Sequence, residues 1–155
     1  MDTIDLMSRV SLIIPALNEA ECLSSLLADI PCGLVDQLIV VDNGSTDNTS
    51  AVARARGAKV IYEPRRGYGY ACAAGAAAAQ GNNLAFMDGD GSFLPGELRN
   101  LLVPIRAGEA DLVLGSRLAL TGKANGMPSH PHLGNWLFVR LLKMRFGLVI
   151  TDLGP

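Results

Sequence analysis

The chain has 155 residues, of which 49% are hydrophobic and 18% are charged. These values predict one folded domain with a buried core, and they exclude the disordered and fibrous classes of protein. Thirteen Lys and Arg against fifteen Asp and Glu give a net charge of −2. This balance provides too little positive charge to bind nucleic acid through its phosphates, so we expect no nucleic-acid partner.

The charges are unevenly distributed along the chain. Residues 1–116 hold 8 of the thirteen basic and 14 of the fifteen acidic residues, which leaves 5 basic residues and 1 acidic residue in 117–155. The last quarter of the sequence is therefore a basic segment, which suits an anionic partner.

The cysteines and the N-terminus indicate the cellular compartment. Cys22, Cys32 and Cys72 are odd in number and lack Cys-x-x-Cys spacing, so they predict neither a disulfide framework nor a zinc ribbon. Asp2 and Asp5 stand where a signal peptide would carry basic residues, and no apolar run reaches the length of about 18 residues that spans a bilayer. We expect a cytoplasmic protein, either soluble or peripheral on the cytosolic membrane face.

Short apolar runs alternate with helical stretches, which is typical of βαβ units and a mainly parallel α/β sheet flanked by helices. The first run, Val10 to Pro15, does not alternate with polar residues, so we expect both of its faces to be covered. The pattern predicts strands at 10–15, 37–42, 59–63, 83–88 and 111–116, with helical stretches at 23–30, 51–56, 68–81, 98–105 and 134–147.

Several residues mark expected helix ends. Asn18 with Glu21 matches a capping box at the start of the first helix, and Gly57 suits the position just beyond the end of the second. Pro95 suits the first turn of the helix that follows the fourth strand, and Pro104 is expected to kink or shorten that helix.

Polar residues gather where the predicted strands end. Asn18 and Glu19 follow the first strand, and residues 42–47 come at the end of the second. Asp88 and Asp90 follow the fourth strand, and Ser116 and Arg117 follow the fifth. Ligands of open parallel α/β sheets bind beyond the carboxyl ends of the strands. The sequence therefore predicts a site on this rim of the sheet.

Asp88 and Asp90 close an apolar strand with only a glycine between them. Mg²⁺ and Mn²⁺ usually take one or two protein carboxylates and complete their shell with water and phosphate oxygens. We interpret the pair as a site for a divalent metal that carries a diphosphate; a solvated Asp-Gly turn is the alternative. The phosphate-loop and dinucleotide glycine motifs are absent, and 65–71 reads either as a phosphate-binding helix start or as a tight turn.

Four ordered blocks, "IIPALNEAE", "LIVVDNGSTDNT", "FMDGDGSFLP" and "LVLGSR", resemble the family 2 glycosyltransferases. Among these, the chain is most similar to the polyprenyl-phosphate (dolichyl-phosphate-like) hexose transferases, which also show a tract like "TDLGP". The resemblance covers Val10 to Pro155. It implies a GT-A (Rossmann-like) fold, a nucleotide-sugar donor, Mg²⁺ or Mn²⁺, and inversion at the anomeric carbon.

The resemblance divides 1–155, a single GT-A domain, into a nucleotide-sugar-binding core at 9–116 and an acceptor- or membrane-facing segment at 117–155. Members of the family usually continue through further elements, so we expect this segment to be incomplete and the domain to be truncated at its C-terminus.

The same resemblance assigns roles to individual positions. Pro15, Leu17 and Glu19 fall where the family contacts the nucleotide, although an aromatic residue often stands in place of Leu17. Asp42 falls on the acid that holds the base or ribose, with a local Asx turn as the alternative.

The remaining positions lie around the diphosphate. Asp88 and Gly89 fall beside the ribose and diphosphate, and Asp90 falls on the principal metal ligand. Ser92 stands where lipid-phosphate transferases often place a metal-binding Gln, and its shorter hydroxyl would act through water. Arg117 falls on the arginine expected at the phosphates, with a surface ion pair as the alternative.

The acceptor decides what else the site needs. A sugar hydroxyl needs a carboxylate base, whereas a phosphate monoester, with a second pKa of about 6, is already mostly dianionic at neutral pH and needs only cations. Arg117, Lys123 and the basic segment supply these cations. The helix at 134–147 is read either as a membrane-surface helix or as an ordinary amphipathic core helix.

We therefore expect an inverting, metal-dependent hexosyltransferase with Asp90 and Arg117 as its catalytic residues and polyprenyl phosphate as its acceptor. One alternative is a family 2 transferase that acts on a sugar hydroxyl in polysaccharide synthesis. The other is a truncated nucleotide-binding module without turnover.

Overall fold

The computed structural model describes residues 9–115 together with Arg140 and Met144. Two compact units divide the chain between Arg106 and Ala107, and the sheet with its helices lies in the first. Arg117, Ser116 and most of the predicted helix at 134–147 lie outside the described residues, although Arg140 and Met144 are both helical and exposed. No described helix has both the length and the apolar run needed to cross a membrane.

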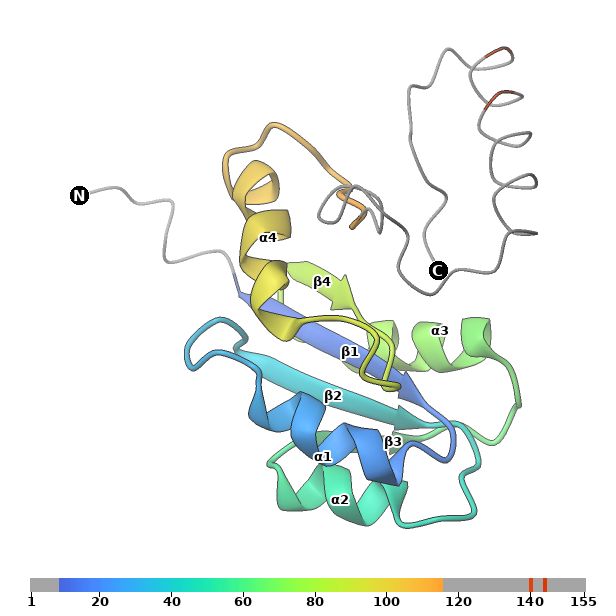
Figure 1. The fold of residues 1–155 in the computed structure, drawn as a ribbon. Coiled ribbons are helices and arrows are strands. Elements are labelled where there is room, and N and C mark those ends of the chain that lie inside the picture. The colour runs from blue at the N-terminus through green and yellow to red at the C-terminus, as the bar shows by residue number, and fades with distance from the viewer. Residues whose placement is uncertain (1–8, 116–139, 141–143, 145–155) are drawn as a thin grey trace. The chain divides into compact units, whose positions relative to one another are not determined.

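Four parallel strands form one sheet in the order β3-β2-β1-β4 (Figure 1). The strands are β1 (Val10–Ala16), β2 (Gln37–Asp42), β3 (Lys59–Tyr62) and β4 (Asn83–Phe86). In the central strand β1, Ile13 pairs with Ile39 of β2 on one side and with Phe86 of β4 on the other. The parallel sheet and the crossing helices confirm the predicted α/β class.

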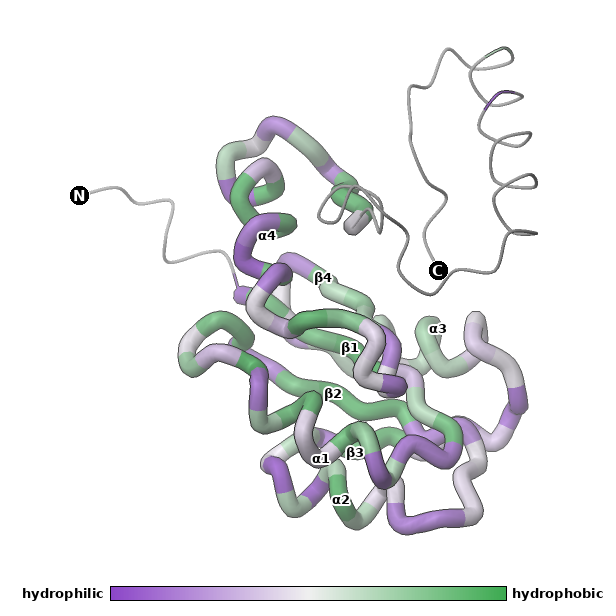
Figure 2. The backbone as a smooth tube through the Cα atoms, in the orientation of Figure 1, coloured by the Kyte–Doolittle hydropathy of each residue, from purple (hydrophilic) through white to green (hydrophobic). Residues whose placement is uncertain are grey.

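Both faces of β1 are covered, which explains its unbroken apolar sequence. Every residue of this strand is buried, and its central side chains alternate between two hydrophobic clusters. Leu12 and Ile14 belong to one cluster and Ile13 to the other. In Figure 2 the hydrophobic parts of the backbone coincide with β1 and β2, and hydrophilic loops follow them.

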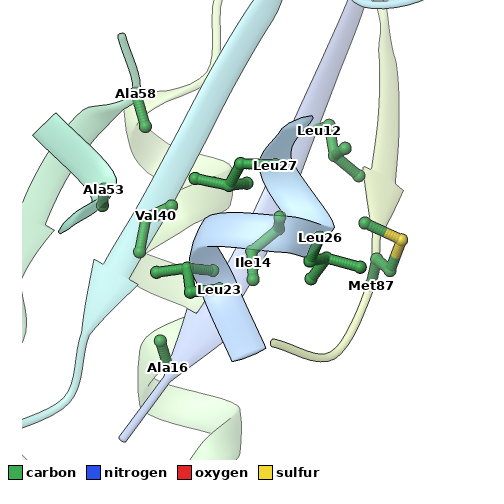
Figure 3. Packing of buried hydrophobic residues seen from close by; sticks show 10 residues of the cluster. All are labelled: Leu12, Ile14, Ala16, Leu23, Leu26, Leu27, Val40, Ala53, Ala58 and Met87. Carbon is green, nitrogen blue, oxygen red and sulfur yellow. The ribbon is translucent and has the colours of Figure 1, made fainter. Parts of the chain in front are cut away.

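Helices α1 (Ala20–Ala28) and α2 (Thr49–Ala55) lie together on one face of the sheet (Figure 1). Leu23, Leu26 and Leu27 of α1 are buried against β1 and β2, as Figure 3 shows. The cluster consists of Leu12, Ile14, Ala16, Leu23, Leu26, Leu27, Val40, Ala53, Ala58 and Met87. Burying one such leucine contributes about 1.5–3 kcal/mol, so this cluster anchors the helices that carry the loops of the rim.

Helix α3 (Tyr68–Ala78) covers the opposite face with small residues (Figure 1). Ala71 and Gly75 are buried against the sheet. A Cβ atom at Gly75 would lie 2.3 Å from Cγ2 of Ile13 and 3.1 Å from Cγ2 of Val41. The alanine- and glycine-rich sequence of α3 therefore allows the helix to pack closely on the sheet.

Two predicted helix ends are confirmed, at Gly57 and at Pro95. Gly57 has φ +79°, and the N–H groups of Gly57 and Ala58 donate to the carbonyls of Arg54 and Ala53. These two bonds form a Schellman motif that ends α2, as predicted. Pro95 opens a short 3₁₀ helix, η2 (Pro95–Glu97), which leads into α4 (Leu98–Arg106).

Two local predictions are wrong. Asn18 and Glu21 form no capping box, because α1 begins only at Ala20 and Asn18 adopts φ 59°. Residues 111–115 form no strand. An apolar run becomes a strand only where a neighbour supplies hydrogen bonds, and no described strand pairs with this run.

Candidate functional site

The carboxyl ends of β1, β2 and β4 lie at the same edge of the sheet because the strands are parallel. Three loops leave this edge: 17–19 after β1, 43–48 after β2 and 87–94 after β4. They contain every predicted site residue of the described chain except Pro15 and Asp42, which end β1 and β2 themselves. The structure therefore brings these residues to one rim, as predicted.

The loops after β1 and β2 are joined by side chains. Oδ1 of Asn18 accepts hydrogen bonds from the N–H of Thr46 at 2.7 Å and from its hydroxyl at 3.2 Å. In return, the N–H of Asn18 donates to Oγ of Ser45 at 3.0 Å. The left-handed backbone of Asn18, which asparagine tolerates better than most residues, turns the chain toward these partners.

The second loop also caps the first helix. The N–H of Ala20 donates to Oδ2 of Asp47 at 3.1 Å, and the N–H of Glu19 donates to Oγ1 of Thr49 at 2.9 Å. A hydrogen bond from the Thr49 hydroxyl is the main reason that the pKa of Asp47 lies below its ordinary value. Asp47 therefore caps the N-terminus of α1 in place of the predicted capping box. Its negative charge is favourable there, because the N-terminus of a helix carries a partial positive charge.

Asp42 ends β2 and is only 6% exposed. Oδ1 accepts a hydrogen bond from the N–H of Ser45 at 2.8 Å, and Oδ2 accepts one from the hydroxyl of Ser50. Burial raises the pKa of Asp42, but the bonds from Ser50 and Ser45 more than offset this, so the pKa is lowered. Asp42 therefore shapes the loop with both oxygens, and its contact with a nucleotide stays a prediction.

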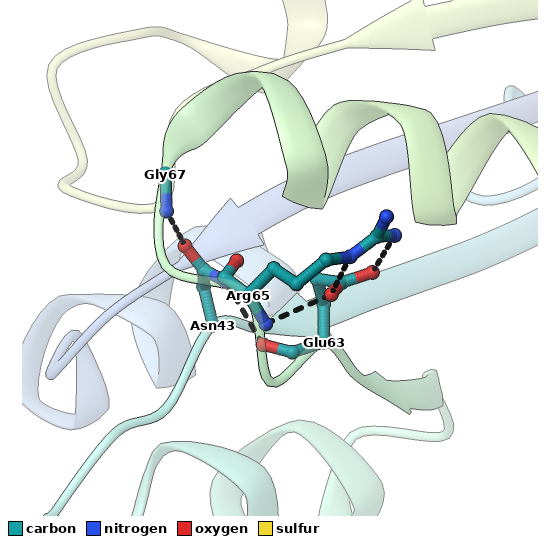
Figure 4. A network of polar contacts seen from close by, with 4 residues as sticks. All are labelled: Asn43, Glu63, Arg65 and Gly67. Carbon is teal, nitrogen blue, oxygen red and sulfur yellow. Dashed lines mark hydrogen bonds and ion pairs between the residues drawn. The ribbon is translucent and has the colours of Figure 1, made fainter.

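Asn43, which sequence reasoning did not single out, connects three parts of the rim (Figure 4). Its buried Nδ2 donates to the carbonyls of Glu63 at 2.9 Å and Arg65 at 2.8 Å, and its Oδ1 accepts from the N–H of Gly67 at 2.7 Å. The guanidinium of Arg65 binds both carboxylate oxygens of Glu63 at 2.8 Å, and the backbone N–H of Arg65 adds a third bond. These bonds lower the pKa of Glu63 to about 2.

Carboxylates from three loops form an acidic cluster, defined here as Glu19, Asp47, Asp88 and Asp90. Burial raises the pKa of Glu19, and the negative charges of Asp90, Asp47 and Asp88 raise it further. The loop after β4 lies close to the end of β1, since a Cβ at Gly89 would be in ordinary contact with Cγ of Glu19 at 3.5 Å and with the carbonyl oxygen of Pro15 at 3.6 Å. The cluster therefore brings four carboxylates together, and their mutual repulsion acts on Glu19.

Asp90 and Ser92 lie on the exposed part of this loop. The N–H of Ser92 donates to Oδ1 of Asp90 at 2.9 Å, so the backbone of Ser92 orients the carboxylate. In the described part of the chain, no three His, Cys, Asp or Glu side chains converge to hold a metal ion alone. Mg²⁺ and Mn²⁺ usually bind through one or two carboxylates and take further ligands from substrate phosphates and water.

Leu17 and Pro15 differ in their access to a ligand. Leu17 is 42% exposed just beyond β1, where it can contact a bound molecule. Pro15 is buried within β1 and pairs with Val41, so it offers only its backbone and the shape of the strand end. Their nucleotide contacts, like a metal contact of Ser92, stay predictions.

Tyr68 joins the site from the first residue of α3 and was missed by sequence reasoning. Its hydroxyl donates to Oδ1 of Asp88 at 3.0 Å. Burial, followed by this bond and the charge of Asp88, raises the pKa of Tyr68. The hydroxyl therefore stays protonated and remains a donor at physiological pH.

Comparison with known proteins gives this rim a context. The family model "Glycosyl transferase family 2" matches residues 11–152. A glycosyltransferase of Mycobacterium tuberculosis is 40% identical over 146 residues, covering 94% of this chain and 65% of that protein. The low-salt glycan biosynthesis hexosyltransferase Agl6 of Haloferax volcanii is 33% identical over 153 residues, covering 96% and 37%. The chain thus spans 37% to 65% of the length of these relatives.

A solved structure matches the fold as well. Glucosyl-3-phosphoglycerate synthase from Mycobacterium tuberculosis, crystallised with Mn²⁺, UDP-glucose and phosphoglyceric acid, aligns with a TM-score of 0.61 and 33% identity. The alignment covers 68% of this chain and 42% of the synthase chain. Together with the parallel sheet described above, this likeness confirms the predicted GT-A fold.

Proposed function

This chain belongs to glycosyl transferase family 2, and we propose that it transfers a hexose, with inversion, from a UDP-sugar to a polyprenyl phosphate at the cytosolic membrane face. The observation that carries the proposal is the acidic cluster at the carboxyl ends of the strands, where burial and three neighbouring carboxylates raise the pKa of Glu19. A divalent cation would reduce the repulsion between these carboxylates and a diphosphate.

Asp90 is the residue that would hold Mg²⁺ or Mn²⁺, with Asp88 and Glu19 adding negative charge behind it. When bound, the metal would stabilise the charge that develops on the diphosphate as the bond to the sugar breaks. The solved synthase, which binds Mn²⁺ together with UDP-glucose, supports this assignment.

The nucleotide would lie toward the end of β2. Asp42 is held with a lowered pKa, so it is ionised at neutral pH and offers acceptors to ribose or base hydroxyl and amino groups. Leu17 offers an exposed apolar surface beside it on the same rim. Pro15 and Glu19 complete this side of the site, and Gly89 leaves room for the diphosphate.

The acceptor is inferred from charge. Arg117 and the basic segment 117–155 lie outside the described residues, but their sequence supplies cations for a dianionic phosphate nucleophile, which needs no base. The likeness to a hexosyltransferase of glycan biosynthesis supports transfer of a hexose. We expect the same segment to lie at an anionic membrane surface.

A second candidate is transfer to a hydroxyl group. It is favoured by the solved relative, whose name and bound phosphoglyceric acid indicate glucosylation of a small phosphorylated molecule. Such an acceptor needs a carboxylate base, whereas a prenyl phosphate does not.

The experiment that tests both is a transfer assay of the purified protein with UDP-glucose, UDP-galactose and UDP-N-acetylglucosamine. Each donor is offered a short prenyl phosphate, 3-phosphoglycerate or a free disaccharide, with Mn²⁺ and with EDTA. Product on the prenyl phosphate, lost with EDTA, is the expected result. Product on a hydroxyl acceptor would replace the first candidate by the second, and Mn²⁺-dependent donor binding without any product would leave a nucleotide-binding module without turnover.

Arg117 separates the two acceptors further. We expect Arg117→Ala to lower transfer to prenyl phosphate by about two to three orders of magnitude, which corresponds to about 2–4 kcal/mol of lost charge stabilisation. Arg117→Lys should recover only part of this rate, because an ammonium group cannot bind two phosphate oxygens in a planar fork. Equal rates in wild type and both variants would contradict the role of Arg117.

A further inference from the structure

We propose that Tyr68 is a positioning residue of the donor site, whose hydroxyl holds the Asp88 carboxylate in the orientation that receives a metal-bound nucleoside diphosphate. This inference rests on the proposed function, and it adds a residue from α3 to a site otherwise built from the loops after β1, β2 and β4.

The contact links two elements that are distant in sequence. Tyr68 is the first residue of α3, and Asp88 lies two residues beyond the end of β4. The donor–acceptor distance of 3.0 Å is at the upper end of the range for an O–H···O hydrogen bond. Asp88 is half-buried and Tyr68 is 55% exposed, so the bond lies where a ligand from solvent can reach the carboxylate.

Tyr68 is itself held in place from both sides. The preceding residue, Gly67, adopts φ +136°, and its N–H donates to the buried Oδ1 of Asn43. On the other side, Ala71 and Gly75 seat α3 against the sheet. The hydroxyl therefore starts from a fixed backbone, which is what a positioning role needs.

The choice of a neutral donor is chemically informative, because two arginines are close by in sequence and neither binds Asp88. Arg65 binds Glu63 through a fork of two bonds, and Nη2 of Arg66 donates to the carbonyl of Gly44 at 3.3 Å. A guanidinium on Asp88 would cancel the charge that attracts a divalent cation. A hydroxyl orients the carboxylate and leaves its charge intact for that cation.

The test compares Tyr68→Phe with Tyr70→Phe. The two tyrosines lie on the same helix and are similarly exposed, at 55% and 50%, so the control loses the same atom without touching Asp88. Calorimetric titration with UDP is carried out with and without Mn²⁺. We expect Tyr68→Phe to weaken Mn²⁺-dependent UDP binding by about tenfold, in the range of one hydrogen bond to a charged group. Metal-free UDP binding and the unfolding temperature should not change, and Tyr70→Phe should stay within twofold of wild type.

A double-mutant cycle with Asp88→Asn distinguishes positioning from a purely structural effect. In the Asp88→Asn background, Tyr68→Phe should change the Mn²⁺-dependent affinity by less than about twofold, because the charge to be oriented is gone. Wild-type affinity in Tyr68→Phe, or a tenfold loss that persists in the Asp88→Asn background, would overturn the inference while leaving the proposed function standing. Absence of Mn²⁺-dependent UDP binding in the wild type would overturn both.

Discussion

Asp42 at the end of β2 and Asp90 beyond the end of β4 belong to the same rim but are held in opposite ways. Asp42 is 6% exposed, its two oxygens accept hydrogen bonds from Ser45 and Ser50, and its pKa is lowered. Asp90 lies on an exposed loop, and its charge helps to raise the pKa of its neighbour Glu19. The carboxylate of the β2 side is held by hydrogen bonds, whereas the carboxylates of the β4 side act on Glu19 as like charges.

This difference separates the roles of the two sides. Satisfied hydrogen bonds make the β2 side stable and rigid before any ligand arrives, which suits recognition of an uncharged nucleoside. On the β4 side, the charges of Asp88 and Asp90 act on Glu19, and a bound cation would reduce this repulsion. Substitutions on the β2 side should therefore alter stability, and those on the β4 side should alter metal-dependent binding.

The largest expected effect is that of Asp90→Ala on donor binding. Loss of the main carboxylate ligand should weaken Mn²⁺-dependent UDP binding by about 100-fold, which corresponds to about 3 kcal/mol for an interaction with a charged group. The free energy of unfolding should change by less than about 0.5 kcal/mol, because the residue is exposed. Calorimetry and urea unfolding measure the two quantities.

Asp29→Ala is the matched control for this substitution. Asp29 is also exposed, follows the last residue of α1 and carries the same charge. It should leave UDP binding unchanged. If Asp90→Ala binds UDP and Mn²⁺ as tightly as Asp29→Ala does, the metal site is elsewhere.

The next effect concerns the stability of the β2 side. Asn43→Ala removes three hydrogen bonds and leaves two carbonyls and one N–H without their partner. The expected loss is about 2–4 kcal/mol in the free energy of unfolding, measured with urea. Asn48→Ala is the control from the same loop, because Asn48 is exposed and its side chain does not cap α2. Equal stabilities of the two variants would show that the network in Figure 4 does not stabilise the fold.

The smallest effect is a pH dependence of the free energy of unfolding. It comes from Glu63, which follows β3 and is bonded to Asn43 on the β2 side. The folded-state pKa of Glu63 is about 2, below its ordinary value of 4.5, because Arg65 stabilises the charged form. A lowered folded-state pKa stabilises the protein above pH 4.5, and this contribution disappears as the pH falls from 4.5 toward 2. Glu63→Gln should therefore differ most from wild type above pH 4.5 and least near pH 2. Urea unfolding across this range is the measurement, with Glu97→Gln as the control; a constant difference would contradict the assignment.

Much of the fold could be predicted because its signals are local. Each apolar run that became a strand has a neighbour in the sheet, and the glycine that ends α2 acts through the residues directly before and after it. The run at 111–115 has the same composition but no partner among the described strands, which a local pattern cannot reveal. The capping box failed for a related reason, since α1 takes its cap from Asp47 in another loop.

The candidate site shows the same division. Asp42, Asp88 and Asp90 could be placed on the rim because each follows a strand directly. Asn43 and Tyr68 could not be recognised, because their partners are 20 to 24 residues away and no spacing rule connects them. Contacts that depend on how elements pack become visible only when the helices and the sheet are seen together.

The position of Tyr68 also depends on Gly75, a buried residue of the same helix. It lies seven residues after Tyr68 on α3, about 10 Å along the helix axis, where the backbone approaches Ile13 too closely for any side chain. Helix α3 therefore connects a close contact in the core, at Gly75, with the hydrogen bond from Tyr68 to Asp88 at the rim. A methyl group at Gly75 would clash with Ile13 and push α3 away from the sheet. The position of the Tyr68 hydroxyl at Asp88 therefore depends on the missing side chain of a glycine in the hydrophobic core.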